Sequence, residues 1–196
     1  MIIEAILIGF LLGFFRNGRL NNFADMRFKG SVLIVLSFFV YISPFALRMM
    51  QIDMAMPQIL PFAAGIIAMV VALVNHEKGG VKLIMLGGVI NLLIMGMNQF
   101  RMPVPVSRMA SSGLASLAES VGAGSVINYV DMANASFLAP YLGKIIVMPA
   151  WYPLNQLISI GDIIMSIGII LLVQGEMMMF SSKRGAMVTF QYHVNK

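Results

Sequence analysis

Five apolar stretches, separated by short loops, fill most of this 196-residue chain. A helix that crosses a lipid bilayer needs about 20 predominantly apolar residues. Four of the stretches meet that requirement directly: residues 30–52, 57–75, 82–100 and 157–174. The first has a shorter uncharged run, but Arg16 and Arg19 can extend their charged ends to the interface, so the predicted helix runs from about Ile2 to Leu20. We therefore predict five transmembrane helices.

The composition excludes a soluble globular domain. Hydrophobic residues make up 59% of the chain and charged residues 11%, whereas soluble domains are about 25% charged. We predict an all-α membrane protein with one membrane domain (residues 1–175) and a cytoplasmic tail (176–196). The net charge of +5 is assigned to lipid headgroups and not to nucleic acid, because the basic residues lie mostly at the ends of the predicted helices.

The basic residues also predict the orientation. Loops on the cytoplasmic side of a membrane carry an excess of Lys and Arg. One side of the predicted bundle holds nine of them: Arg16, Arg19, Arg27, Lys29, Lys78, Lys82, Lys183, Arg184 and Lys196. The other side holds four: Arg48, Arg101, Arg108 and Lys144. The prediction is a multi-pass protein of the cell membrane with its N-terminus outside and its C-terminus inside. Because Glu4 precedes the first apolar run and the positive charges follow it, we expect a retained helix and not a signal peptide.

The long connection between the fourth and fifth helices, residues 101–156, is predicted to form an extracytoplasmic cap. Within it, residues 107–121 are expected to form one short helix with Met109, Leu114, Leu117 and Val121 on one side. Residues 137–153 are rich in aromatic and apolar side chains that suit the headgroup layer. In the tail, residues 188–194 alternate apolar and polar side chains, which is typical of a strand; the alternative is a frayed terminus.

Two further patterns concern helix packing. Ala5, Gly9 and Gly13 repeat every four residues, a stripe of small side chains that allows another helix to approach closely. Pro44, Pro57 and Pro61 are expected to end or kink the second and third helices near the outer surface.

Asp162 is the clearest ionisable residue inside a predicted span. A charge in hydrocarbon costs a few kcal/mol, so such a residue is a candidate site. Ser159 and Ser166 lie on the same face of its helix. Asn91, Asn98 and Arg101 share a face of the preceding span, and both faces can meet in one outer pocket. We interpret this polar cluster either as a clamp in which Arg101 neutralises Asp162 or as a ligand-binding or catalytic site.

Other chemistry has weaker support. The chain has no cysteine and nineteen methionines. Thioethers bind Cu(I), but methionine is also a flexible apolar filler and is spread through every span, so we predict no metal site and no cofactor. His76 and His193 are isolated, and neither is assigned a role.

Three short motifs resemble an uncharacterised family of small bacterial integral membrane proteins, defined as a domain of unknown function. They are Gly18-Arg19-Leu20, the run NQFRMPV at 98–104 and the run SIGD at 159–162. The family often carries Leu-Gly-Asp before an apolar run, whereas this chain has Leu142-Gly143-Lys144. The resemblance implies a membrane location but no activity.

The segment 155–172 is also similar to the last helix of lipoprotein signal peptidase, an intramembrane aspartic enzyme, although its Asn-Ala-Asp core is missing. This resemblance implies Asp162 and Asp131 as the two catalytic carboxylates, which would have to share one water molecule.

These observations favour a non-enzymatic binding or complex-forming membrane module, whose partners are the bilayer and other membrane subunits or further copies of the chain. The alternatives are an intramembrane aspartic hydrolase and a carrier for a small solute or ion.

Overall fold

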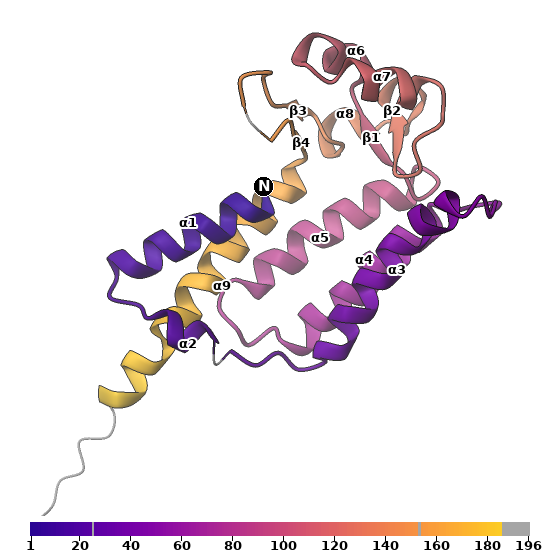
Figure 1. Cartoon of the computed structure of the whole chain (residues 1–196). Coiled ribbons are helices and arrows are strands. Elements are labelled where there is room, and N and C mark those ends of the chain that lie inside the picture. The colour runs from indigo at the N-terminus through magenta and orange to yellow at the C-terminus, as the bar shows by residue number, and fades with distance from the viewer. Residues whose placement is uncertain (25, 153, 186–196) are drawn as a thin grey trace, which may run out of the picture.

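The protein consists of a helical bundle with a smaller cap at one end (Figure 1). The structure is a computed structural model, and it describes residues 1–24, 26–152 and 154–185. Side chains are described up to Met179. The predicted strand at 188–194 lies outside the described residues.

The bundle contains the apolar stretches as helices. They are α1 (Ile2–Phe15), α2 (Leu20–Ala24), α3 (Ser31–Met49), α4 (Ile59–Val74), α5 (Val81–Gly96) and α9 (Ile160–Gly185). Among the described residues, two helices are long and apolar enough to cross a membrane, namely α3 and the Ile160–Met179 part of α9. The helices α1, α4 and α5 are apolar but shorter.

Several of the predicted helix boundaries differ from those in the structure, most clearly in the first and last helices. The first helix ends at Phe15 and not at Leu20, because the chain turns at Asn17, where φ is +62°. The last helix begins at Ile160 and not at 157, because Leu157–Ile158 forms a strand. It then continues to Gly185. Helix α3 runs through Pro44 without ending there.

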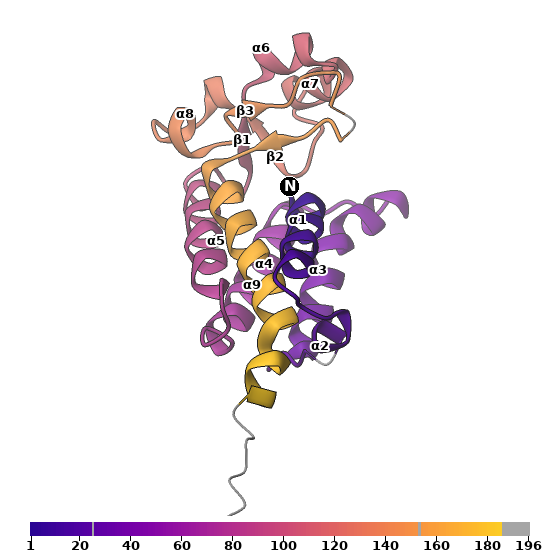
Figure 2. The same cartoon turned by 90° about the vertical axis from the view of Figure 1, so that its left-hand side faces the viewer.

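The helices pack as two pairs around α5. Helix α1 packs on α9, and α3 packs on α4, while α5 contacts both α9 and α4. The two views in Figures 1 and 2 show α1 and α9 on one side of the bundle and α3 and α4 on the other. Helices α1 and α3 are not among the pairs that pack extensively.

Glycines allow the closest helix contacts. The predicted small-residue stripe is confirmed, because Ala5, Gly9 and Gly13 are the buried residues of α1 and a Cβ at Gly9 would lie 2.8 Å from Val173 of α9. A second contact joins α5 to α9, where a Cβ at Gly87 would lie 2.3 Å from the carbonyl oxygen of Gly161. Backbone approaches of this kind exclude any larger residue.

The cap is more varied than the single helix that we predicted for residues 107–121. It contains α6 (Val106–Met109), the 3-10 turn η1 (Ala110–Ser112) and α7 (Ala115–Gly122) in that region. The break falls at Gly113, whose φ is +80°, a conformation that glycine adopts readily. Met109 and Val121 are buried in the core of the cap.

The protein is mostly helical, as predicted, and in its described residues the cap adds four short strands that we did not predict. Strand β1 (Met102–Val104) pairs in parallel with β2 (Tyr129–Asp131), so that Met102 faces Tyr129 and Val104 faces Asp131. Strand β3 (Ile146–Val147) pairs antiparallel with β4 (Leu157–Ile158). Between them lie η2 (Met132–Asn134) and α8 (Ala139–Leu142). Such short backbone pairings leave little periodicity in the sequence.

Hydrogen bonds hold the cap on the bundle. The Asn98 amide at the end of α5 donates to Ser136 Oγ at 3.1 Å and accepts from the Ser136 N–H at 2.6 Å. Arg48 at the end of α3 donates to the carbonyl oxygen of Ser125 at 2.6 Å. The Tyr152 hydroxyl donates to Glu4 of α1 at 3.0 Å. The cap is therefore fixed to three different helices.

The opposite end of the bundle has its own ion pair. Lys78, in the turn before α5, lies 2.7 Å from the buried carboxylate of Glu176 on α9. Asn75, at the end of α4, exchanges hydrogen bonds with the backbone of Lys29 at 2.9 and 2.8 Å. These contacts fix the turns that connect the helices.

The glycine contact between α5 and α9 can be tested by substitution. Gly87→Val would place methyl groups against the α9 backbone, and overpacking of this kind costs about 1–3 kcal/mol. We expect a clearly lower melting temperature in detergent. Gly175→Val is the matched control, because a Cβ at Gly175 meets nothing within 4 Å. Equal melting temperatures for both variants would contradict the proposed packing.

Candidate functional site

Ser159 and Asp162 form a capping box at the start of α9. The Asp162 N–H donates to Ser159 Oγ at 2.9 Å, and the Ser159 N–H donates to Asp162 Oδ2 at 3.0 Å. This reciprocal pair satisfies backbone donors that a helix start otherwise leaves unpaired, and the carboxylate also lies at the favourable end of the helix dipole. The SIGD run thus has a local structural role, with Gly161 allowing the close approach of α5.

Three more contacts complete the surroundings of Asp162. Its Oδ1 accepts a hydrogen bond from Asn91 Nδ2 of α5 at 2.8 Å. Its Oδ2 lies 2.7 Å from Lys144 Nζ in the cap. Ser159 Oγ donates to Asn91 Oδ1 at 2.8 Å. The structure therefore brings Asn91, Ser159 and Asp162 together in one hydrogen-bonded cluster.

The cation of this cluster is Lys144. The prediction that Arg101 neutralises Asp162 is therefore wrong. The backbone N–H of Lys144 donates to the carbonyl oxygen of Pro103 at 2.9 Å, which places the residue beside β1. Its ammonium group also donates to the carbonyl oxygen of Leu157 at 3.0 Å. The side chains of Lys144 and Asp162 are 18% and 19% exposed, so the pair is largely shielded from solvent.

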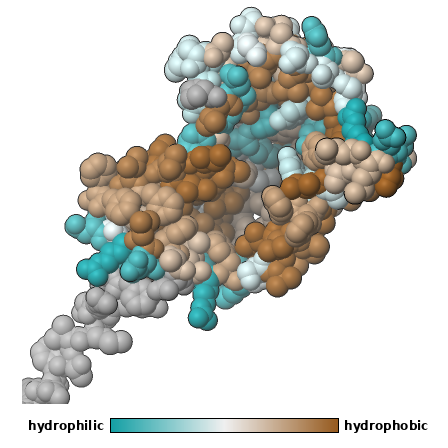
Figure 3. Space-filling model, viewed as in Figure 1, coloured by the Kyte–Doolittle hydropathy of each residue, from teal (hydrophilic) through white to brown (hydrophobic). Residues whose placement is uncertain are grey.

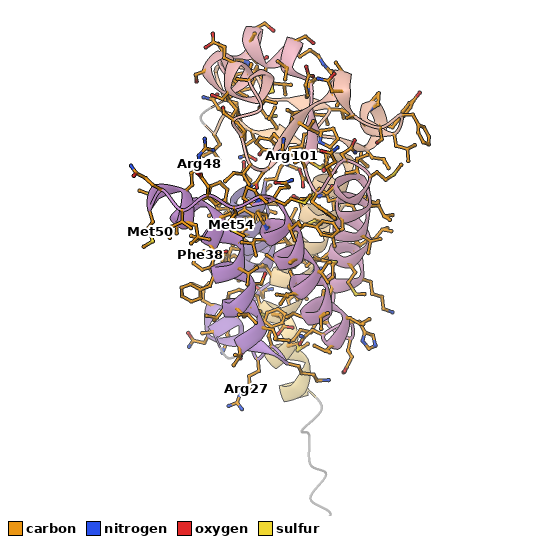
Figure 4. All side chains as sticks on the ribbon, turned by 90° about the vertical axis from the view of Figure 1, so that its right-hand side faces the viewer. Arg27, Phe38, Arg48, Met50, Met54 and Arg101 are labelled. Carbon is orange, nitrogen blue, oxygen red and sulfur yellow. The ribbon has the colours of Figure 1, made fainter. Side chains whose placement is uncertain are left out.

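Arg101 lies at the junction of bundle and cap (Figure 4). Within the described part of the chain, no carboxylate lies within 4.0 Å of its guanidinium group, and its buried Nε has no hydrogen-bond partner. The turn at Gln99 and Phe100, whose φ angles are +55° and +64°, precedes Arg101. Spacing along an ideal helix cannot predict the direction of a side chain beyond such a turn.

The other predicted site residues have separate environments. Asn98 holds the cap, as described above. Ser166 is buried on α9, and its Oγ has no hydrogen-bond partner. Asp131 accepts a hydrogen bond from the Ala133 N–H at 3.1 Å at the start of η2. In the described residues, no hydrogen bond connects Asp131 to Asp162. In an aspartic hydrolase, these two carboxylates would have to share one water molecule.

A cavity of about 570 Å³ lies beside the Lys144–Asp162 pair. It is bounded by α1, α3, α4, α5 and α9 and closed at one end by the cap. Most of its lining is apolar: Ile2, Ile34, Phe38, Pro61, Ala64, Gly65, Ala68, Met69, Gly88, Leu92, Met95, Met102 and Met165. Figure 3 shows the hollow between the two hydrophobic helix pairs, beneath the cap. Its volume is in the range of small-molecule sites.

Polar groups gather at the cap end of this cavity. Lys144, Asn91, Asn128, Tyr41 and Tyr129 line it there, while Asp162 lies behind Lys144 and Asn91. Burial and the nearby negative charge of Asp162 raise the pKa of Tyr129 above its usual value. The Tyr129 phenol therefore remains protonated at neutral pH and can donate a hydrogen bond. The described residues contain no cluster of three His, Asp or Glu side chains that could hold a metal ion.

The comparisons with known proteins identify a family but no activity. A family of unknown function, DUF5317, matches residues 25–174. The chain belongs to this family. The match covers α3 to most of α9 and includes the NQFRMPV and SIGD runs, whereas Gly18-Arg19-Leu20 precedes it. No curated protein and no solved structure matches the chain. The expectation of a family of unknown function is thus confirmed.

Sequence reasoning missed Lys144, Tyr41, Asn128 and Tyr129 as members of the site. One signal could have found Lys144: a buried carboxylate requires a cation, and the loop offers only Arg101, Arg108 and Lys144. The other three converge through the pairing of β1 with β2 and the position of α3, which no local pattern predicts.

Removal of Lys144 should destabilise the protein strongly. Lys144→Met leaves the Asp162 carboxylate buried without its cation, and breaking such pairs costs about 3–5 kcal/mol when burial is complete. We expect a loss of about 2 kcal/mol and a smaller loss for Lys144→Met/Asp162→Asn than the sum of the single losses. The free energies of unfolding of the single and double variants are measured in detergent, and Lys82→Met, at an exposed position, is the control. Additive effects would refute the pair, whereas Arg101→Met and Asp162→Asn should add within about 0.5 kcal/mol.

Proposed function

We propose that this protein is a multi-pass protein of the cell membrane that binds an amphiphilic molecule from the outer leaflet. In this proposal α1, α3, α4, α5 and α9 cross the membrane, with the N-terminus and the cap outside. The protein acts as a non-enzymatic binding module. The observation that carries the proposal is the apolar cavity with a polar end beneath the cap.

The surface of the helices supports the membrane location. Large apolar side chains are exposed along α1 and α3, including Phe15 (84%), Val32 (78%) and Phe39 (65%). Exposed apolar area of this extent marks a membrane or protein contact. Arg27 and Arg48 lie beyond opposite ends of the apolar part of α3, and Phe38 lies between them (Figure 4). Such a band with basic ends suits a bilayer.

The position of the cavity supports an amphiphile as its ligand. Ile34, Phe38 and Tyr41 of α3 line the cavity and are nevertheless 44%, 59% and 47% exposed. They therefore form a rim that faces the surroundings of the helices and not the core. In a membrane this rim opens to lipid, so that molecules dissolved in the bilayer can enter between α1 and α3.

The topology can be tested because the chain has no cysteine. Single cysteines at Ser116 in the cap and at His76 in the turn between α4 and α5 are both at exposed positions. We expect a membrane-impermeant thiol reagent to label Ser116→Cys in intact cells and His76→Cys only after permeabilisation. Labelling of both, or of neither, in intact cells would contradict the orientation.

Filling the cavity should abolish binding. Ala68 lines the cavity on α4, so Ala68→Phe occupies space that the ligand needs. Ala46→Phe is the matched control, because Ala46 is exposed on α3 and does not line the cavity. We expect native mass spectrometry to show a co-purified amphiphile on the wild type and on Ala46→Phe, and at least about tenfold less on Ala68→Phe. Equal occupancy in all three proteins would refute the proposed site.

A further inference from the structure

We infer that the ligand carries an uncharged headgroup rich in acceptor oxygens, such as the hydroxyl and ester groups of a diacylglycerol. The inference rests on the proposed function and adds the chemical class of the ligand. It follows from the charges, the hydrogen-bond donors and the depth of the cavity.

The charge at the polar end is already balanced. Lys144 is the cation that lines the cavity, and its ammonium group lies 2.7 Å from the Asp162 carboxylate. An anionic headgroup beside Lys144 would therefore meet a cation that is already neutralised, and it would be repelled by Asp162. Burial of a charge without its own partner is costly. The site thus disfavours phosphate and carboxylate headgroups.

The polar end offers donors to a ligand. The Lys144 ammonium group has three N–H donors, and it uses two of them on Asp162 and Leu157. The protonated Tyr129 phenol adds another. Carbonyl and hydroxyl oxygens accept such hydrogen bonds without bringing a charge.

The protein also has a buried hydrogen-bond acceptor without a donor near the polar end. The Oδ1 atom of Asn128 is buried without a hydrogen bond, and an unsatisfied buried acceptor costs about 1–3 kcal/mol. A ligand hydroxyl can donate to it. A headgroup with both a hydroxyl and ester carbonyls therefore matches the polar end.

The deeper part of the cavity suits an apolar chain. Ala68, Met69 and Gly88 line it about midway along α4 and α5, and Met165 lines it from the second turn of α9. The small residues provide width, and methionine adapts to irregular shapes. Because Ala68, Met69 and Gly88 lie farther from the cap than the polar groups, a ligand would place its headgroup under the cap and its tail toward the middle of the membrane.

The test compares two lipids that differ in headgroup charge. Wild-type protein in nanodiscs is titrated with dioleoylglycerol and with dioleoyl phosphatidylglycerol, and binding is measured by native mass spectrometry. We expect the neutral lipid to bind at least about tenfold more tightly, which corresponds to about 1.4 kcal/mol. Equal binding, or tighter binding of phosphatidylglycerol, would overturn the inference.

Asp162→Asn tests directly whether the charge of Asp162 determines the preference for a neutral headgroup. This variant leaves the positive charge of Lys144 uncompensated, so an opposite charge gains attraction in a site of low dielectric constant. We expect affinity for phosphatidylglycerol to rise about tenfold or more while affinity for dioleoylglycerol changes little. Asp131→Asn is the control and should leave both affinities unchanged. An unchanged preference in folded Asp162→Asn would also overturn the inference.

Lys144→Met/Asp162→Asn keeps the test decisive if the single variant does not fold. Both charges are then absent, and the preference for the neutral lipid should remain. Failure of the inference differs from failure of the proposed function: Ala68→Phe blocks both lipids if the cavity binds amphiphiles, whatever the headgroup. Lipid binding that is blocked by Ala68→Phe but shows no dependence on charge would refute only the headgroup.

Discussion

The hydrogen-bond set of Asp162 joins the parts of this molecule. One carboxylate contacts α5 through Asn91, caps α9 through Ser159 and holds the cap through Lys144. A largely buried charge must have such partners, because an unmet hydrogen bond or an uncompensated charge is costly away from water. The cap, α5 and α9 must therefore all be in position for the Asp162 carboxylate to have its full set of partners.

The sequence predicted those features that depend on local periodicity and side-chain size. Apolar runs predicted the helices, the Ala5-Gly9-Gly13 repeat predicted a close contact of α1 with another helix, and the unusual position of Asp162 pointed to a polar cluster with Asn91 and Ser159. The first two signals lie within single helices, and the third combines the polar faces of two helices that follow each other in the chain. Such predictions succeed because the geometry of a helix fixes which residues lie on the same face.

The features that the sequence did not predict depend on turns and on contacts between distant segments. Lys144 reaches Asp162 because its backbone N–H is bound to the carbonyl oxygen of Pro103. Arg101 lies outside the Asp162 cluster because the two residues before it have positive φ and turn the chain. The cap strands are two or three residues long, too short for an alternating pattern. These arrangements come from tertiary packing, which overrides weak local preferences.

The cavity follows from the same packing. Gly9 and Gly87 let α1 and α5 approach α9 closely, whereas α1 and α3 are not among the helix pairs that pack extensively. Small residues on α4 and α5 then leave the space between the two helix pairs unfilled. In water such an apolar cleft would favour collapse, whereas in a bilayer lipid-like molecules can occupy it at little cost.

The depth of the polar groups explains why an amphiphile could enter this cleft from the membrane. Lys144, Asn128 and Tyr129 belong to the cap and line the cavity from there, at the end of the bundle where α3 finishes near Arg48. Under the proposed orientation, this level corresponds to the outer headgroup layer, where polar lipid groups already reside. A molecule that moves sideways through the rim keeps its headgroup at the same depth and its tail in an apolar environment. Entry then requires no polar group to cross hydrocarbon, and selectivity is left to the charge balance between Lys144 and Asp162.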